Sequence, residues 1–122
     1  MEHVLRAAPL EACGILSGRG SQAQTYYEMT NGDRSRDHYS MVPQEQFKVI
    51  KAIRAAQQEM LAICHSHPGT SARPSQEDLR LALTPDVVYV IVSLLEPETP
   101  VVKGFLIENA IVTEVPIVMT AA

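Results

Sequence analysis

The apolar residues of this chain fall into short runs that are separated by polar or proline-containing turns. Short apolar runs bounded by Gly, Pro, Asn or Asp are typical of β-strands. The pattern predicts six strands, at residues 11–18, 22–30, 60–66, 87–95, 101–107 and 110–119. Residues 38–41 are expected to add a short edge strand.

The composition of these runs indicates their places in a sheet. Residues 11–18 and 87–95 are apolar on both faces, so both strands are expected to be buried and the second to be central. Residues 22–30 are the expected antiparallel partner of the first run. The last two runs should form a closing hairpin, in which Pro116 indicates an edge position or a bulge.

Helical spacing of apolar residues is clearest over residues 43–58, where Pro43 suits the first turn. One side of this helix is predicted to carry Phe47, Ile50, Ile53, Ala55 and Ala56, and the other to carry Lys48, Lys51, Arg54 and Gln58. A second helix is expected from Ser75 to about Leu83, and residues 1–8 are helix-prone but short.

Six strands and two well-defined helices, with most strands adjacent along the chain, predict an α+β fold. Its mixed sheet should be flanked by helices, because the elements lack the regular alternation of a wound parallel sheet. A chain of 122 residues with 46% hydrophobic and 20% charged residues fits a single domain over residues 1–122.

The charge pattern argues against two classes of partner. The net charge is −4 and no run of Lys or Arg occurs, so nucleic acid and anionic membranes are not expected to bind. No apolar run reaches the roughly 18 residues of a membrane span. The first residues lack the basic start and apolar stretch of a secretory signal, which favours a cytoplasmic location.

Two cysteines, Cys13 and Cys64, are present. Reduced, buried thiols are typical of a cytoplasmic chain, and a disulfide or metal ligation are the alternatives. Cys64 lies next to His65 and should therefore face the opposite side of its strand.

Two histidines, His65 and His67, stand at the end of the apolar run of residues 60–66. Side chains at positions i and i+2 of a strand point to the same face, so both imidazoles can coordinate one metal ion. A carboxylate from the next helix, Asp78, would add a third ligand and leave a fourth position open, as in catalytic zinc sites. The alternative is a pair of surface histidines.

Asp78 and Ser75 also have a purely structural explanation. Ser75 suits a helix N-cap, and an acid three residues later can complete a capping box. The two roles are compatible, because a cap that defines the start of the helix also aims Asp78.

Glu11 begins the apolar stretch PLEACGIL, where a carboxylate is otherwise hard to explain. A buried, unpaired carboxylate is costly, and a water activated by zinc needs a general base. Glu11 is therefore the candidate base. The alternative is an exposed acid at the end of a strand.

These residues together resemble the JAMM motif of the Jab/MPN-domain metallopeptidases of the active, MPN-plus type. The matching stretches are P-x-E-A-C-G-I-L-S-G with Glu11, and H-S-H, seven residues, Ser75, two residues and Asp78. The resemblance covers nearly the whole chain. It implies a mixed, partly barrel-like β-sheet flanked by helices, with a layout related to that of the zinc deaminases.

The resemblance also implies roles. His65, His67 and Asp78 would bind one Zn²⁺, with a water as fourth ligand. Glu11 would act as general base, and Ser75 would hydrogen-bond the water or the oxyanion. The family hydrolyses peptide or isopeptide bonds after the C-terminal tail of ubiquitin-like proteins. The expected partner is such a protein, a sulfur carrier for the small prokaryotic members.

Two other functions fit parts of the pattern. A non-catalytic MPN-like scaffold would usually lose one or more motif residues, whereas this chain keeps all five. A zinc deaminase would carry H-x-E and P-C-x-x-C signatures, which are absent. The oligomeric state stays open, with a homodimer as one alternative.

Overall fold

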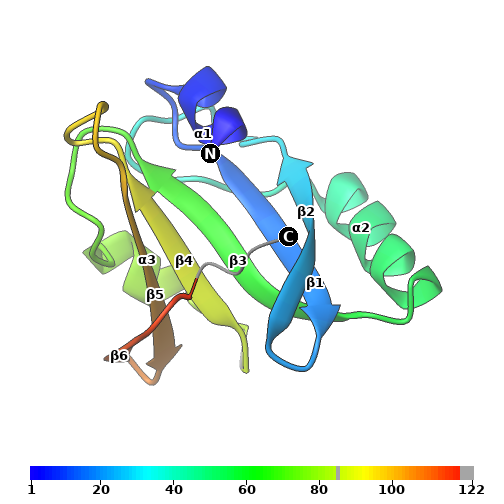
Figure 1. Ribbon diagram of the computed structural model, residues 1–122. Coiled ribbons are helices and arrows are strands. Elements are labelled where there is room, and N and C mark those ends of the chain that lie inside the picture. Colours follow the sequence, from blue (N-terminus) through cyan, green and yellow to red (C-terminus); the bar gives the residue numbers. More distant parts are fainter. Residues whose placement is uncertain (85, 119–122) are drawn as a thin grey trace.

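The computed structural model describes residues 1–84 and 86–118. These residues form one six-stranded sheet in the order β2-β1-β3-β4-β5-β6, with three helices packed around it (Figure 1). The strands are β1 (Cys13–Arg19), β2 (Gln22–Met29), β3 (Glu59–His67), β4 (Val88–Ser93), β5 (Val101–Glu108) and β6 (Ile111–Val115). The helices are α1 (Glu2–Ala7), α2 (Pro43–Ala55) and α3 (Gln76–Leu81).

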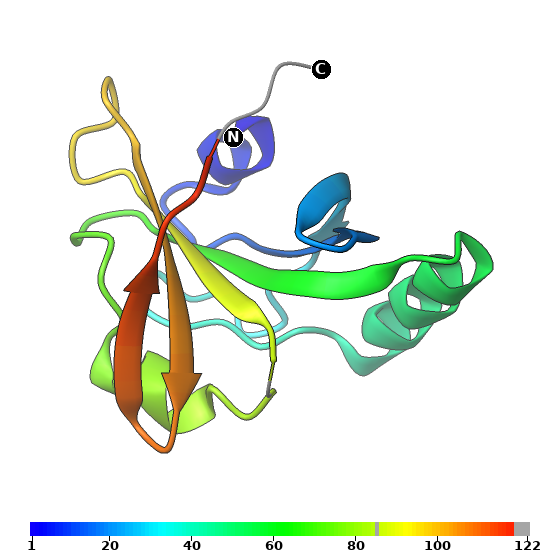
Figure 2. The same ribbon diagram turned by 60° about the horizontal axis from the view of Figure 1, so that its bottom comes forward.

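The strand pairing confirms the predicted α+β fold. All neighbouring strands are antiparallel except β3 and β4, which are parallel and are connected through α3. The sheet is strongly twisted, so that β5 and β6 run across the direction of β3 (Figure 2). It is curved but open, with β2 and β6 as its outer strands. Both expected hairpins form, and the two buried strands, β1 and β4, lie inside the sheet.

The apolar side predicted for α2 is buried only in part, since Ile53 lies in the core and Phe47 and Ile50 do not. Phe47 and Ile50 are 61% and 41% exposed, whereas Val49 and Ile53 are buried. Val49 and Ile53 lie one turn apart, and both pack in a cluster with β1 and β2 side chains. Lys51 Nζ lies 4.7 Å from the centroid of the exposed Phe47 ring. Helix α2 therefore contacts the sheet through a narrower row of apolar side chains, Val49 and Ile53, than its apolar composition indicates.

Two predicted boundaries are also corrected. Helix α2 ends at Ala55 rather than at residue 58, because Gln57 takes a positive φ of 56°. Residues 38–41 do not form a strand; one isolated bridge pairs Asn31 with Met41. The backbone of this loop is held instead by the side chain of Asn31, as described below.

Cys13 and Cys64 are free, buried thiols. Cys13 pairs with His65 across β1 and β3 and therefore faces the same side as that histidine, whereas Cys64 packs in a cluster on the opposite face. Burial raises the pKa of each thiol to about 12. The disulfide alternative is therefore not realised, and both residues act as small core side chains.

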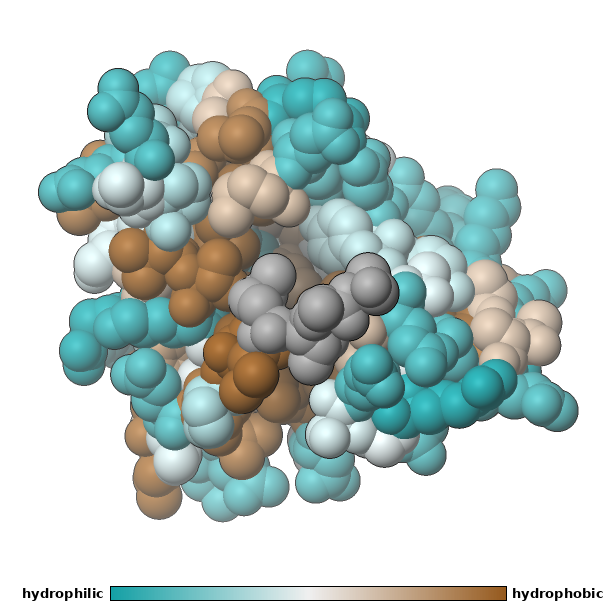
Figure 3. Space-filling model, in the orientation of Figure 1, coloured by the Kyte–Doolittle hydropathy of each residue, from teal (hydrophilic) through white to brown (hydrophobic). Residues whose placement is uncertain are grey.

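The face of the sheet that carries Cys64 is partly apolar at its surface. Figure 3 shows hydrophobic residues gathered over β5 and β6, while the α2 end of the molecule is mainly hydrophilic. Val102 and Leu106 of β5 are 41% and 40% exposed on this side. Among the described residues, no helix is long and apolar enough to cross a bilayer.

Candidate metal centre

The C-terminal end of β3 presents both histidines to the same face. His65 and His67 are 2% and 3% exposed, because β3 lies between β1 and β4. Ser66, between them, points the other way, and its Oγ accepts a hydrogen bond from the Ala12 N–H at 2.8 Å. The alternation expected from the sequence thus places two imidazoles in a buried position.

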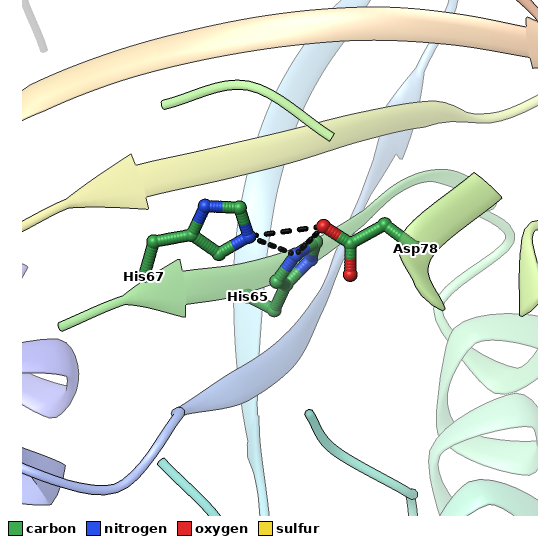
Figure 4. A group of neighbouring side chains, drawn as sticks. All are labelled: His65, His67 and Asp78. Atoms are coloured by element: carbon green, nitrogen blue, oxygen red, sulfur yellow. Dashed lines mark hydrogen bonds and ion pairs between the residues drawn. The ribbon is translucent and has the colours of Figure 1, made fainter. Parts of the chain in front are cut away.

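The start of α3 supplies the carboxylate. Ser75 is the N-cap, and its Oγ accepts from the Asp78 N–H at 3.0 Å, while Asp78 Oδ2 accepts from the Ser75 N–H at 2.9 Å. This is the predicted capping box. It turns Asp78 toward the sheet, where Oδ2 lies 2.9 Å from His67 Nε2 and 3.2 Å from His65 Nε2 (Figure 4).

The three side chains are compatible with a metal site. His65 Nε2 and His67 Nε2 are 3.2 Å apart, so the three acceptor atoms form a small triangle with edges of 2.9 to 3.2 Å. Ligands at about 2.0–2.1 Å around a tetrahedral zinc lie about 3.3–3.4 Å apart. His67 Nδ1–H can donate to the Ser71 carbonyl at 2.8 Å, which leaves Nε2 free as a ligand.

The electrostatics of the triangle favour an ionised acid. Burial raises the pKa of Asp78, but hydrogen bonds from His65, His67 and the Ser75 N–H outweigh it and hold that pKa well below its usual range. Burial lowers the pKa of His67, but the bonds to Asp78 and to the Ser71 carbonyl outweigh burial and raise it. Without a cation these three side chains must share protons. A bound divalent ion would take the place of those protons.

Glu11 lies next to this triangle. It is 3% exposed, and its Oε1 has no hydrogen-bond partner among the described residues. Burial raises the pKa of Glu11 to about 8. Glu11, His67 and Ser75 line one cavity of about 340 Å³. The alternative of an exposed acid at a strand end is therefore wrong.

The raised pKa of Glu11 predicts how pH changes the stability of the metal-free protein. The folded state holds a proton that the unfolded state loses near pH 4.5, so wild-type stability falls as pH rises from about 4.5 to 8. Glu11→Gln removes this loss. In EDTA, the variant should match wild type near pH 4 and exceed it by roughly 4 kcal/mol above pH 8, as measured by urea unfolding.

Glu98→Gln, at an exposed loop position, controls for the loss of one carboxylate. A Glu11→Gln stability advantage that stays constant from pH 4 to 9 would contradict the burial argument, because a pH-independent gain cannot come from ionisation.

Two contributors to the site were missed by sequence reasoning. Asn31 is buried, and its Nδ2 donates to the Glu11 carbonyl at 3.1 Å and to the His38 carbonyl at 3.0 Å. It thus ties the backbone of the acid to the loop that follows β2. In that loop, Tyr39 stacks on His65 with 4.8 Å between ring centroids. The turn residues after Thr30 predicted a loop, but nothing in a loop pattern indicates bonds to residues 20 positions away.

All five predicted site residues therefore come together. Glu11 precedes β1, His65 and His67 end β3, and Ser75 and Asp78 begin α3. Within the described residues, the cluster of His, Cys, Asp or Glu side chains that can hold a metal contains neither cysteine.

Comparison with known proteins gives the same family. A family model described as prokaryotic homologs of the JAB domain matches residues 1–105. A CysO-cysteine peptidase of Mycobacterium tuberculosis is 39% identical over 117 residues, covering 94% of this chain and 80% of that protein. A probable TtuB-protein conjugate cleaving protease of Thermus thermophilus is 35% identical over 81 residues, covering 66% of this chain and 54% of that protein.

Solved structures agree in fold. The solution structure of a Desulfitobacterium hafniense protein has a TM-score of 0.90 and 43% identity, covering 99% of this chain and 86% of that one. A Salinibacter ruber protein has a TM-score of 0.68 and 27% identity, covering 97% and 83%. With a family model matched over most of its length and a 39% identical relative, this chain belongs to the prokaryotic homologs of the JAB domain.

Proposed function

We propose that this protein is a zinc metallopeptidase that hydrolyses a peptide or isopeptide bond at the C-terminal tail of a ubiquitin-like sulfur-carrier protein. The observation that carries the proposal is the buried triangle of His65, His67 and Asp78 beside Glu11, whose Oε1 has no hydrogen-bond partner in the described part of the chain. The names of two relatives, a CysO-cysteine peptidase and a probable TtuB-protein conjugate cleaving protease, support the substrate class.

His65 Nε2, His67 Nε2 and Asp78 Oδ2 would hold the ion. Bound zinc lowers the pKa of a water to around 7 and polarises a carbonyl group. Glu11 Oε1, an acceptor without a partner in residues 1–84 and 86–118, takes the proton of the attacking water and then passes it to the leaving amine. A nearby cation lowers the pKa of a buried acid. The pKa of Glu11, about 8 without a cation, would therefore move toward about 7, and the ionised side chain could then act as a base at neutral pH.

Ser75 provides a directed donor. Its Oγ already accepts the Asp78 N–H, so its own hydroxyl hydrogen is available to the negative oxygen that develops on the scissile carbonyl. The cavity that Ser75 shares with Glu11 is also lined by Pro68, Gly69 and Thr70. An extended protein tail with small residues suits a cavity of about 340 Å³ better than a folded segment does.

A scaffold without catalysis is the second candidate. It would gain nothing from burying Glu11, whose Oε1 finds no partner among the residues that the structure describes, because an unpaired buried carboxylate destabilises the fold. The cost is explained when the acid has a chemical task.

The test is direct hydrolysis. The protein, loaded with one equivalent of zinc, is incubated with ubiquitin-like sulfur carriers that bear C-terminal extensions or isopeptide-linked peptides. Intact mass spectrometry then locates the cleaved bond. Cleavage directly after the carrier tail supports the proposal. Zinc binding without cleavage of any carrier would favour the scaffold.

Replacing Ser75 should separate its two roles. Ser75→Ala is expected to cost about 1 kcal/mol of stability through the lost cap, and to lower kcat about 100-fold through the lost donor. Ser75→Asp is a matched control, since aspartate is a good N-cap but an ionised carboxylate cannot donate. If Ser75→Asp restored both stability and kcat, Ser75 would be only a cap.

A further inference from the structure

Lys103 of β5 lies on the same face of the sheet as the metal centre. His65 pairs with Ile91 across β3 and β4, and Ile91 pairs with Lys103 across β4 and β5. Residues paired across neighbouring strands point to the same face. Strands are about 4.8 Å apart, so the backbone of Lys103 lies about 10 Å from that of His65, in the same row of the sheet.

A cation is unexpected at this position. The next residues of β5 on this face, Phe105 and Ile107, belong to the buried apolar core. Lys103 itself is half-buried, and it forms no ion pair with a carboxylate in residues 1–84 and 86–118. An ammonium group that has no counter-charge within these ranges and faces an open cavity is available to an anion that binds beside it.

A second cation faces the same space. Arg73 and Lys103 line an open cavity of about 550 Å³, and Arg73 likewise forms no ion pair within the described ranges. The lining contains one carboxylate, Glu96, which is exposed and accepts from the Thr99 hydroxyl at 3.3 Å. Two cations against one carboxylate leave this cavity positive, whereas the whole chain is negative.

The loop of residues 70–73 connects the lining of this cavity with the metal centre through hydrogen bonds. The Ser71 carbonyl accepts hydrogen bonds from His67 Nδ1–H at 2.8 Å and from the Arg73 N–H at 2.9 Å. Ser93 of β4 donates to the Thr70 carbonyl at 2.5 Å and so holds the loop against the sheet. The position of Arg73 is therefore tied to that of His67, a proposed metal ligand.

We propose that Arg73 and Lys103 bind the free C-terminal carboxylate of the departing peptide, and that the enzyme thereby prefers short C-terminal extensions over isopeptide conjugates. The proposal rests on the proposed peptidase function. An extended chain spans about 3.4 Å per residue, so about 10 Å accommodates a leaving peptide of up to three residues. Arginine suits a carboxylate because its guanidinium donates two parallel hydrogen bonds, and lysine adds a point charge.

The test compares two versions of one substrate. A sulfur carrier is prepared with a three-residue extension that ends either in a free carboxylate or in an amide. For the wild-type enzyme, kcat/KM should be about 10 to 100 times higher for the carboxylate, which is the range for a hydrogen bond to a charged group. In Arg73→Gln and Lys103→Gln this ratio should fall toward one, and Lys103→Arg should keep most of it.

Lys48→Gln, on the exposed surface of α2, is the matched control for the loss of one positive charge and should keep the wild-type ratio. A wild-type ratio near one would overturn the inference while leaving the proposed peptidase function intact. So would an unchanged ratio in both Arg73→Gln and Lys103→Gln.

Binding to the Glu11→Gln protein provides a second measurement that does not need turnover. Calorimetry with the zinc-loaded variant compares the free acid and the amide of the same extended carrier. Tighter binding of the free acid than of the amide, with the difference lost when Lys103→Gln is added, supports the carboxylate site. This conclusion holds even if the wild-type enzyme cleaves no carrier. The absence of cleavage would reject only the peptidase function. Equal binding of acid and amide overturns the inference.

Discussion

Glu11→Gln is expected to abolish cleavage of a carrier tail while leaving the metal in place. Glu11 is buried, and its Oε1 has no hydrogen-bond partner among the described residues, so it can take up a proton. Glutamine keeps the size of the side chain but cannot accept that proton. Loss of a general base typically costs a factor of 10² to 10⁴, and we expect kcat to fall about 1,000-fold.

The measurement combines initial rates of tail cleavage with zinc content by elemental analysis. Glu45→Gln is a suitable control, because Glu45 accepts hydrogen bonds from Thr30 at the start of α2. Wild-type rates in Glu11→Gln would show that another group acts as the base. A variant that loses both zinc and activity would instead make Glu11 a contributor to metal binding.

His67→Ala is expected to remove the stabilisation that zinc confers. A ligand that binds only the folded state adds about 4 kcal/mol when its concentration is about 1,000 times its Kd. In His67→Ala the triangle loses the atom that lies 2.9 Å from Asp78 Oδ2, and with it one of three ligands. Zinc at that concentration should therefore raise the Tm of wild type strongly and the Tm of the variant little.

His3→Ala is the matched control. His3 contacts Tyr26, and both residues are distant in sequence from His65, His67 and Asp78. Thermal unfolding with and without zinc, together with direct titration of the chelator-treated protein, provides the readout. Equal zinc-induced Tm shifts in wild type and His67→Ala would contradict the ligand assignment. Asp78→Asn should behave like His67→Ala but also weaken the capping box, because the amide carries no charge.

The strands and the capping box could be predicted from sequence because their signals are local. The structure confirms a buried strand at Val88–Ser93. It also confirms that His65 and His67, two residues apart, lie on one face of their strand. Ser75 and Asp78 form the capping box that their spacing predicts. Each of these features depends on residues fewer than ten positions apart.

Helix α2 shows where local pattern fails. Its apolar residues predicted burial of Phe47 and Ile50, yet the line of Val49 and Ile53 faces the sheet. Composition establishes that a helix is amphipathic but leaves its rotation to the neighbouring surface. Here that surface is formed by β1 and β2 side chains, whose arrangement depends on strand register.

The sequence by itself determined the chemical groups of this protein and their local order: two imidazoles on one strand face, a capped carboxylate, and an acid in an apolar run. Tertiary structure decided which of them meet and in what surroundings. Glu11 becomes buried only in the folded chain, where long-range bonds from its N–H to the Ser35 carbonyl and from Asn31 Nδ2 to its own carbonyl hold its backbone. Only strand register places Lys103 in the row of His65. The physical reason is that periodicity sets which way a side chain points along its own strand, whereas pairing between distant segments sets its neighbours.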